Sequence, residues 1–230
     1  MDTSLTAALG VGFLLGLRHA ADADHVAAVS AFVAQHRSLA RSCLLGTFWG
    51  AGHTAALLVA GVATIAFKLT ISPAVERGLE TLVAFVLVLL GGQVLLRSLG
   101  TVAVHRHDHA HGDQLHRHVH AHVGDRSAHG HLHLLRVGRR PFLVGVLHGM
   151  AGSAALVLLV LSTIAHPLGG LLYIMVFGVG STAGMLCLSG LIALPLALTA
   201  NRWTTLNRII QVAAGASSLG LGLWLVWDLT

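Results

Sequence analysis

The chain has little charge. Of its 230 residues only 10 % are charged and 55 % are hydrophobic, whereas a soluble domain carries about 25 % charged residues. This composition excludes an ordinary soluble globular protein. A helix needs about 20 apolar residues to cross a bilayer about 30 Å thick, so the length allows about six or seven crossings. We therefore expect one membrane domain whose main surroundings are the lipid bilayer.

Cysteine, lysine and glutamate are nearly missing too. Cys43 and Cys187 show no CxxC spacing and lie in or beside apolar segments, which argues against a disulfide. The single lysine, Lys68, follows Phe67, so the Gly-Lys-Ser/Thr of a P-loop is absent. No glutamate follows a histidine and no two histidines are adjacent. Intramembrane metalloproteases and di-iron hydroxylases are therefore disfavoured, and we expect no enzyme.

Six apolar segments are long enough to span a membrane. They occupy about residues 4–34, 43–67, 79–99, 141–165, 168–199 and 209–227. The segment 168–199 exceeds one crossing and contains Pro195 and several glycines. We therefore expect it to be either tilted and broken or partly re-entrant.

The positions of the basic residues predict the orientation. Eleven arginines fall in joints on one side of the predicted bundle, whereas the other side has only Lys68 and Arg77. The positive-inside rule then places the loop 101–140 in the cytoplasm and both termini outside a cytoplasmic (inner) membrane. The net charge of +5 is thus an orientation signal, and we expect no nucleic-acid partner.

The two halves of the chain resemble each other. FWGAGHTAALLVAG at 48–61 is similar to FGVGSTAGMLCLSG at 177–190, and His19 and His148 are separated by a similar interval. We predict an all-α integral membrane protein with six transmembrane helices arranged as two inverted three-helix repeats, as in many secondary transporters. The domains would be 1–100, a flexible histidine-rich cytoplasmic loop at 101–140, and 141–230. The alternative is that glycine-rich membrane helices look alike because small residues favour helix packing.

Ionisable residues gather inside the first apolar segment. They are Arg18, His19, Asp22, Asp24 and His25, and each charge at membrane depth costs about 2.5–3.5 kcal/mol. At 100° per residue, His19, Asp22 and His25 share one helical face with Arg18 beside it. Asp24 lies off that face. Unless the helix unwinds there, Asp24 would support a ligand histidine or pair with another helix.

Two imidazoles with one or two carboxylates form a mixed nitrogen and oxygen site that suits Ni²⁺, Co²⁺ or Zn²⁺. The alternative is an Arg18–Asp22 ion pair with hydrogen-bonded histidines that only hold the bundle together. His53, beside two glycines in the second apolar segment, is a further candidate ligand. Other polar residues that could line the site are Arg18, Thr54, His148, Ser153, Ser181 and Thr182.

These motifs resemble a known family. His19-Ala20-Ala21-Asp22-Ala23-Asp24-His25 matches the HX4DH signature of the nickel/cobalt transporter family, and GAGHT at 50–54 resembles its next-helix motif. The runs at 147–155 and 177–182 resemble second-half motifs of the shorter, urease-associated branch. The chain departs from longer members in having about six helices rather than eight. The resemblance implies passage of Ni²⁺ or Co²⁺, handled by His19, Asp22, Asp24, His25 and His53.

The predicted cytoplasmic loop contains 11 of the 17 histidines. They alternate with other residues at His105, His107, His109, His111, His116, His118, His120, His122, His129, His131 and His133. Such tracts bind Ni²⁺, Cu²⁺ or Zn²⁺ through neutral imidazole, so we expect metal buffering or sensing. The alternative is a solvated basic loop without a specific role.

Taken together, the sequence predicts a secondary transporter that imports nickel and/or cobalt. The metal ion is the substrate, no cofactor is expected, and a cytoplasmic metallochaperone is a candidate partner. A histidine-rich loop also resembles that of nickel/cobalt efflux permeases, so efflux is one alternative. A metal-binding membrane accessory protein for metalloenzyme assembly, which transports nothing, is another. Neither the preferred metal, the coupling ion nor the oligomeric state follows from the sequence.

Overall fold

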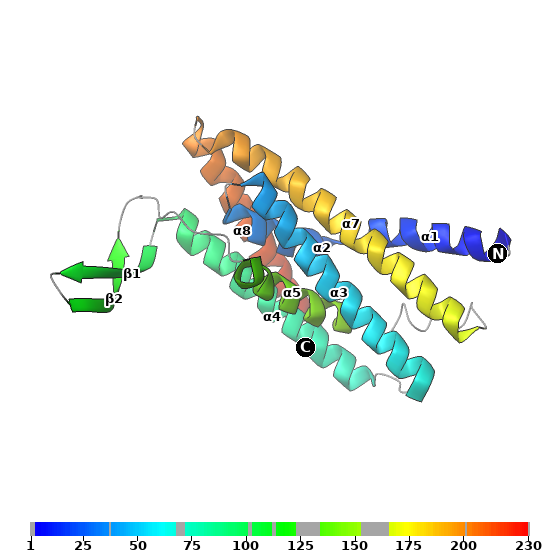
Figure 1. Cartoon of the computed structure of the whole chain (residues 1–230). Helices are drawn as coiled ribbons and strands as arrows, with labels where there is room; N and C mark the ends of the chain where they lie inside the picture. Colours follow the sequence, from blue (N-terminus) through cyan, green and yellow to red (C-terminus); the bar gives the residue numbers. More distant parts are fainter. Residues whose placement is uncertain are drawn as a thin grey trace.

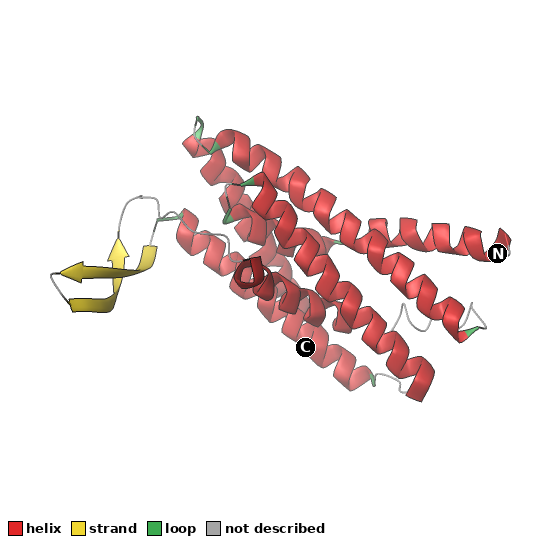
Figure 2. Ribbon diagram, in the orientation of Figure 1, coloured by secondary structure: helices red, strands yellow, loops and turns green. Residues whose placement is uncertain are grey.

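A computed structural model of the chain describes residues 3–36, 38–67, 72–100, 103–111, 114–122, 134–152, 166–200 and 202–229. Long helices lie side by side in a bundle, and a pair of strands protrudes at one end (Figures 1 and 2). The elements in chain order are α1 (Thr3–His19), α2 (Ala23–Ala34), α3 (Leu39–Phe67), α4 (Pro73–Ser98), β1 (Ala103–His111), β2 (Gln114–His122), α5 (Leu134–Ala151), α7 (Pro167–Thr199) and α8 (Thr204–Asp228).

Four helices are long and apolar enough to cross a membrane. They are α3, α4, α7 and α8, with 25 to 33 residues each, and at 1.5 Å per residue even the shortest measures about 37 Å. Large apolar side chains such as Leu89 and Leu191 are 70 % exposed on the bundle surface, as expected for contact with lipid. The chain is therefore a helical membrane protein, and these four helices match the second, third, fifth and sixth predicted segments.

The expected break in 168–199 is wrong, because α7 is continuous from Pro167 to Thr199. Pro195 lies near the end of α7, where the loss of one backbone hydrogen bond disturbs little of the helix. Glycines that suggested an interruption instead face other helices. A methyl group on Gly178 would overlap Thr54 of α3, and one on Gly180 would overlap the Phe13 carbonyl group of α1.

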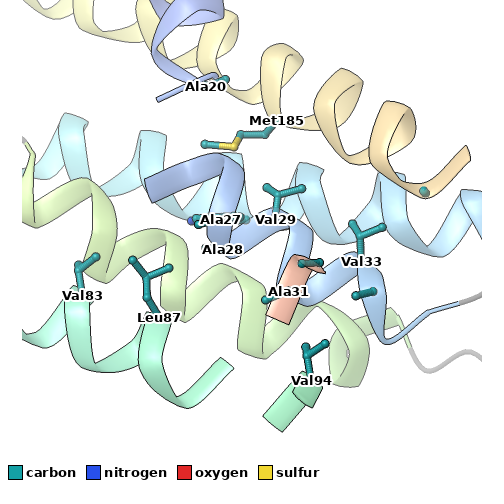
Figure 3. Packing of buried hydrophobic residues seen from close by; sticks show 14 of the residues in the cluster. Ala20, Ala27, Ala28, Val29, Ala31, Val33, Val83, Leu87, Val94 and Met185 are labelled. Carbon is teal, nitrogen blue, oxygen red and sulfur yellow. The ribbon is translucent and has the colours of Figure 1, made fainter. Parts of the chain in front are cut away.

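The first predicted segment, 4–34, is not one helix. α1 ends at His19 and α2 begins at Ala23, and the 12 residues of α2 are too few to cross a bilayer. α2 instead forms the centre of the bundle, in contact with α3, α4, α7 and α8. Figure 3 shows its residues Ala28, Val29 and Val33 among side chains of α4 and α7.

The histidine-rich region differs from the expected flexible loop. β1 and β2 pair in antiparallel register with His105 opposite His120, His107 opposite His118 and His109 opposite His116. Alternation of histidine with other residues has the two-residue period of a strand, although no apolar pattern marks it. α5 starts at Leu134, inside the predicted loop. His129, His131, His133 and the part of the fourth predicted segment at 153–165 lie outside the described residues.

Contacts between α3 and α7 come in reciprocal pairs. A methyl group on Gly50 would lie 2.6 Å from the Cα of Thr182, and one on Gly178 would overlap the side chain of Thr54. Thr182 follows Thr54 by 128 residues, and Gly178 follows Gly50 by the same interval. In one pair the glycine comes from α3 and the threonine from α7, and in the other pair the helices are exchanged. The Thr54 hydroxyl donates to the Gly178 carbonyl at 2.9 Å and lies 3.1 Å from the Thr182 hydroxyl.

The same exchange relates the helices that flank α3 and α7. Gly16 of α1 faces the Phe177 carbonyl of α7, and Gly145 of α5 faces the Trp49 carbonyl of α3. Glycine permits such close approach because it has no Cβ atom. Contacts between α4 and α8 repeat similarly, with Gly91 against Gly215 and Gly222 against Ala84.

We predict that Gly91→Ala separates α4 from α8. Its methyl group would lie 2.6 Å from the Gly215 carbonyl oxygen, and relief of such overpacking costs about 1–3 kcal/mol. The matched control is Gly92→Ala, which adds the same methyl group with nothing within 4 Å and should not lower stability. Thermal unfolding of the detergent-solubilised variants measures the difference. Equal midpoints would contradict the close packing of α4 on α8.

Candidate metal centre

The chain unwinds between α1 and α2, in the middle of the ionisable segment. Asp22 adopts an extended backbone (φ −64°, ψ 149°) just before α2 and makes no side-chain cap of that helix. Its carboxylate instead accepts a hydrogen bond from Nδ1 of His19 at 2.8 Å. Beyond the break, Asp24 occupies the first turn of α2, where the helix dipole favours a negative charge. The His19 and His25 ring centroids lie 4.6 Å apart.

A hydrogen bond at Nδ1 of His25 leaves its Nε2 unprotonated and able to bind a metal ion. Its Nδ1 is 2.8 Å from the carbonyl oxygen of His19, and Nδ1 must donate because a carbonyl only accepts. The side chain is fully buried, and its Nε2 has no hydrogen-bond partner among the described residues. A buried polar atom without a partner costs about 1–3 kcal/mol. Histidines whose other nitrogen donates to a backbone carbonyl are typical metal ligands.

His19 and His53 point at each other across the α1–α3 contact. Their Nε2 atoms are 3.2 Å apart, and Nδ1 of His53 is buried without a partner among the described residues. Two nitrogens bonded to one ion at about 2.0–2.1 Å in tetrahedral geometry lie about 3.3 Å apart. The spacing of this histidine pair therefore fits two ligands of a single ion.

A second group of ligand atoms shares His25. Nε2 of His148, on α5, donates to Oδ2 of Asp24 at 2.6 Å, and the other Asp24 oxygen accepts from the His25 backbone N–H at 3.0 Å. Ligand atoms of Asp24, His25 and His148 lie within 4.8 Å of one another, as do those of the group formed by His19, His25 and His53. Four imidazoles and one carboxylate thus converge inside the bundle.

Close helix packing and an aromatic wall enclose the cluster. Gly149 lies against the His53 carbonyl, which allows α5 to bring the neighbouring His148 to the site. The buried Trp49 ring is 5.8 Å from both the His25 and the His148 ring. His25, His53 and His148 are at most 5 % exposed. Nitrogen donors with one carboxylate in such surroundings could bind divalent first-row metal ions.

The structure exchanges the expected positions of the two aspartates. Asp22 has a side chain that is 52 % exposed and contacts the cluster only through His19, whereas Asp24 touches both His25 and His148. The helical projection assumed a continuous helix, so it put Asp22 on the ligand face and Asp24 off it. The break between α1 and α2 reverses that assignment.

Of the expected lining residues that the structure describes, His148 alone joins the ligand groups. Arg18 is exposed, and the Asp22 carboxylate pairs with His19 instead of Arg18. Thr54 and Thr182 instead connect α3 to α7, and the Ser181 hydroxyl is buried without a partner among the described residues. Ser153 lies outside the described part of the chain.

Sequence reasoning did not identify two aromatic neighbours of the site. Phe177 places its ring 5.4 Å from His19, and Trp49 flanks the other histidines. Trp49 belongs to the FWGAG run and Phe177 to the similar FGVG run, and an apolar aromatic residue in a membrane helix is usually a packing residue. The similarity of the two runs could have indicated their place near the site, because it aligns Phe48 with Phe177.

These observations describe a helical membrane protein in which histidines and a carboxylate gather inside the bundle. The family of high-affinity nickel-transport proteins, NicO, matches residues 5–224 of the chain. A urease accessory protein, UreH, of Bacillus sp. (strain TB-90) is 38 % identical over 220 residues, which cover 95 % of this chain and 90 % of that protein. No solved structure matches the chain.

The chain therefore belongs to the NicO family of nickel transporters. Family membership confirms the resemblance noted from the HX4DH motif, and it confirms that this is a transport or accessory protein rather than an enzyme.

We predict that His25→Gln weakens nickel binding by at least about 10- to 100-fold, the loss that follows when even a supporting partner of a metal ligand is removed. His36→Gln is the matched control, because His36 also donates through Nδ1 to a backbone carbonyl, that of Phe32, but lies outside both ligand groups. Equilibrium nickel binding to the solubilised variants is the measurement. The histidine-rich segment contributes equally to both variants, and equal affinities would contradict the ligand role of His25.

Proposed function

We propose that this protein is a secondary transporter that imports Ni²⁺, and Co²⁺ with it, across the cytoplasmic membrane. The observation that carries the proposal is that His25, whose buried Nε2 has no partner among the described residues, belongs to both groups of ligand atoms. Membership of a nickel-transport family supports nickel as substrate. Cobalt is included because the same nitrogen and oxygen donors accept both ions.

His19, His25 and His53 form the proposed first set of ligands, with Asp24 and His148 as the second. Asp22 orients His19 by accepting from its Nδ1, which leaves Nε2 to bind the ion. An ion that moves from the first set to the second keeps His25 as a common ligand, so it need not return to water between them.

The helices form two inverted three-helix repeats in this proposal, with 1–100 and 141–230 as the halves. Reciprocal contacts such as Gly50 with Thr182 and Gly178 with Thr54 support it, since a two-fold relation exchanges each residue with its equivalent. The ligand groups lie where the broken helix of the first half meets α5 of the second. Movement of one half against the other would open the site to each side in turn.

In this proposal the termini lie outside and the histidine-rich segment in the cytoplasm, which the excess of arginine on one side of the bundle supports. An inside-negative potential favours entry of a divalent cation by about 4.6 kcal/mol per 100 mV. Import can therefore proceed without ATP and without a cofactor.

The histidine-rich segment is proposed to receive the ion on the cytoplasmic side. The β1–β2 register sets His105 opposite His120, His107 opposite His118 and His109 opposite His116. Imidazole nitrogens are ligands for divalent first-row metal ions. From there a cytoplasmic metallochaperone could collect it.

Delivery to a metalloenzyme is the second candidate function. The relative from Bacillus sp. is named a urease accessory protein, and its similarity extends over nearly the whole of both chains. An accessory protein that only binds nickel would use the same cluster but would not move the ion across a membrane.

Asp24→Asn is expected to reduce nickel uptake by cells at least tenfold, because it removes the carboxylate between His25 and His148. Asp22→Asn should reduce nickel uptake less, since Asp22 contacts the ligand groups through His19 and its side chain is half exposed. Accumulation of radioactive nickel in cells expressing each variant tests this. Equal losses in the two variants would contradict the assignment of Asp24 to the site.

Flux distinguishes the candidate functions. Proteoliposomes with an inside-negative potential should accumulate nickel when they contain the wild-type chain and should not when they contain His25→Gln. Nickel binding without flux would favour the accessory role, and protection of expressing cells against nickel would favour efflux.

Replacing the eight histidines of β1 and β2 with glutamine is expected to lower the number of nickel ions bound per chain by at least one. Flux into proteoliposomes should stay within about twofold of wild type, because the intramembrane cluster is unchanged. Equilibrium dialysis gives the stoichiometry, and an unchanged stoichiometry would contradict the proposed receiving role.

A further inference from the structure

A cavity of about 270 Å³ adjoins the metal cluster. His19, His53, His148 and Asp24 form one part of its wall, while Glu80 of α4 and Asp228 of α8 form another part together with apolar residues of those helices. Neither Glu80 nor Asp228 belongs to the ligand groups or to any motif of the family resemblance. Two carboxylates therefore line the cavity without a role in the proposed function.

Helix packing places these two carboxylates at the same end of the bundle. α4 and α8 run antiparallel, because Ser98 bonds to Gln211 near one end and Gly222 faces Ala84 toward the other. Glu80 lies one turn before Ala84, and Asp228 is the last residue of α8. Under the proposed orientation, this end faces the outside of the cell.

The charged side chains of the cavity wall are all acidic. Glu80, Asp228 and Asp24 are three of the nine acidic residues of the chain. No lysine or arginine lines the cavity among the described residues. His53 lines the same cavity; it is only 1 % exposed, and its buried Nδ1 has no partner among the described residues. A cleft lined by one sign of charge concentrates counter-ions.

The volume suits a cation that still carries its water. Six water molecules occupy about 180 Å³ in the liquid, which the cavity of about 270 Å³ can hold together with the ion. The ligand atoms of the inner cluster, by contrast, lie within 4.8 Å of one another. An ion must therefore lose most of its water on passing from the cavity to the histidines.

We propose that this cavity is a vestibule in which Glu80 and Asp228 hold a hydrated divalent cation before Asp24 and the histidines bind it directly. The proposal rests on the proposed transport function and extends it to selectivity. Carboxylates and water suit Mg²⁺ as well as nickel, whereas imidazoles select the transition metal. The vestibule thus selects by charge and the inner cluster by ligand type.

The test is nickel flux into proteoliposomes containing the double variant Glu80→Gln/Asp228→Asn. The half-saturating nickel concentration should rise by about tenfold or more, because a cleft lined by one sign of charge raises the local concentration of counter-ions by about 10- to 1,000-fold, while the maximal rate stays near wild type. Added Mg²⁺ should raise the half-saturating concentration of wild type and should have much less effect on the double variant. Glu76→Gln, one turn earlier on α4 and outside the cavity wall, is the matched control.

An unchanged half-saturating concentration in the double variant would overturn the vestibule, and so would an equal shift in Glu76→Gln, which would indicate surface charge in general. A fall in maximal rate alone would assign Glu80 and Asp228 a structural role and would overturn it too. If wild type shows no flux, the proposed function fails separately. Equilibrium binding then decides, because loss of a weak, Mg²⁺-sensitive nickel site in the double variant would still support the vestibule, and its persistence would overturn it.

Discussion

The hydrogen bond from Nδ1 of His25 to the carbonyl oxygen of His19, 2.8 Å long, joins the two helices at the point where the chain unwinds. The His19 carbonyl, which lacks the bond that a continued helix would supply, accepts this bond as well as one from the Asp22 backbone N–H at 3.1 Å. The imidazole bond also leaves the buried Nε2 of His25 with a lone pair. The junction of the two helices and the ligand chemistry of His25 therefore share one bond.

Glycine residues allow the helices to pack closely around the break between α1 and α2. Helices α1 and α5 approach α7 and α3 closely enough for backbone atoms to touch, at Gly16 and Gly145 respectively, and the short α2 fills the centre between them. Apolar association of this kind has no hydrophobic driving force in lipid, so van der Waals contact across smooth surfaces must supply the attraction. Close contacts of the same kind thus recur between α1 and α7 and between α5 and α3.

The site itself is less symmetric than its surroundings. His19 and His148 occupy comparable places in the two halves, yet the position of His53 corresponds to Ser181 in the second half. The first half therefore contributes three of the four histidines, and the second supplies one histidine and the apolar wall near Phe177. Nitrogen and oxygen donors gathered inside a helical bundle suit divalent metal ions, which agrees with membership of a nickel-transport family.

Composition was enough to predict a membrane protein and to locate four of its long helices. The HX4DH spacing and the adjoining apolar segment pointed to His19, His25 and His53 as neighbours. It did not determine which aspartate enters the cluster, because a helical projection extends a regular backbone through Asp22, whereas the break depends on contacts with distant helices. His148 joins Asp24 across 124 residues, and no local pattern encodes that pairing. Residue type fixed the available chemistry, and only helix packing decided which of those groups meet.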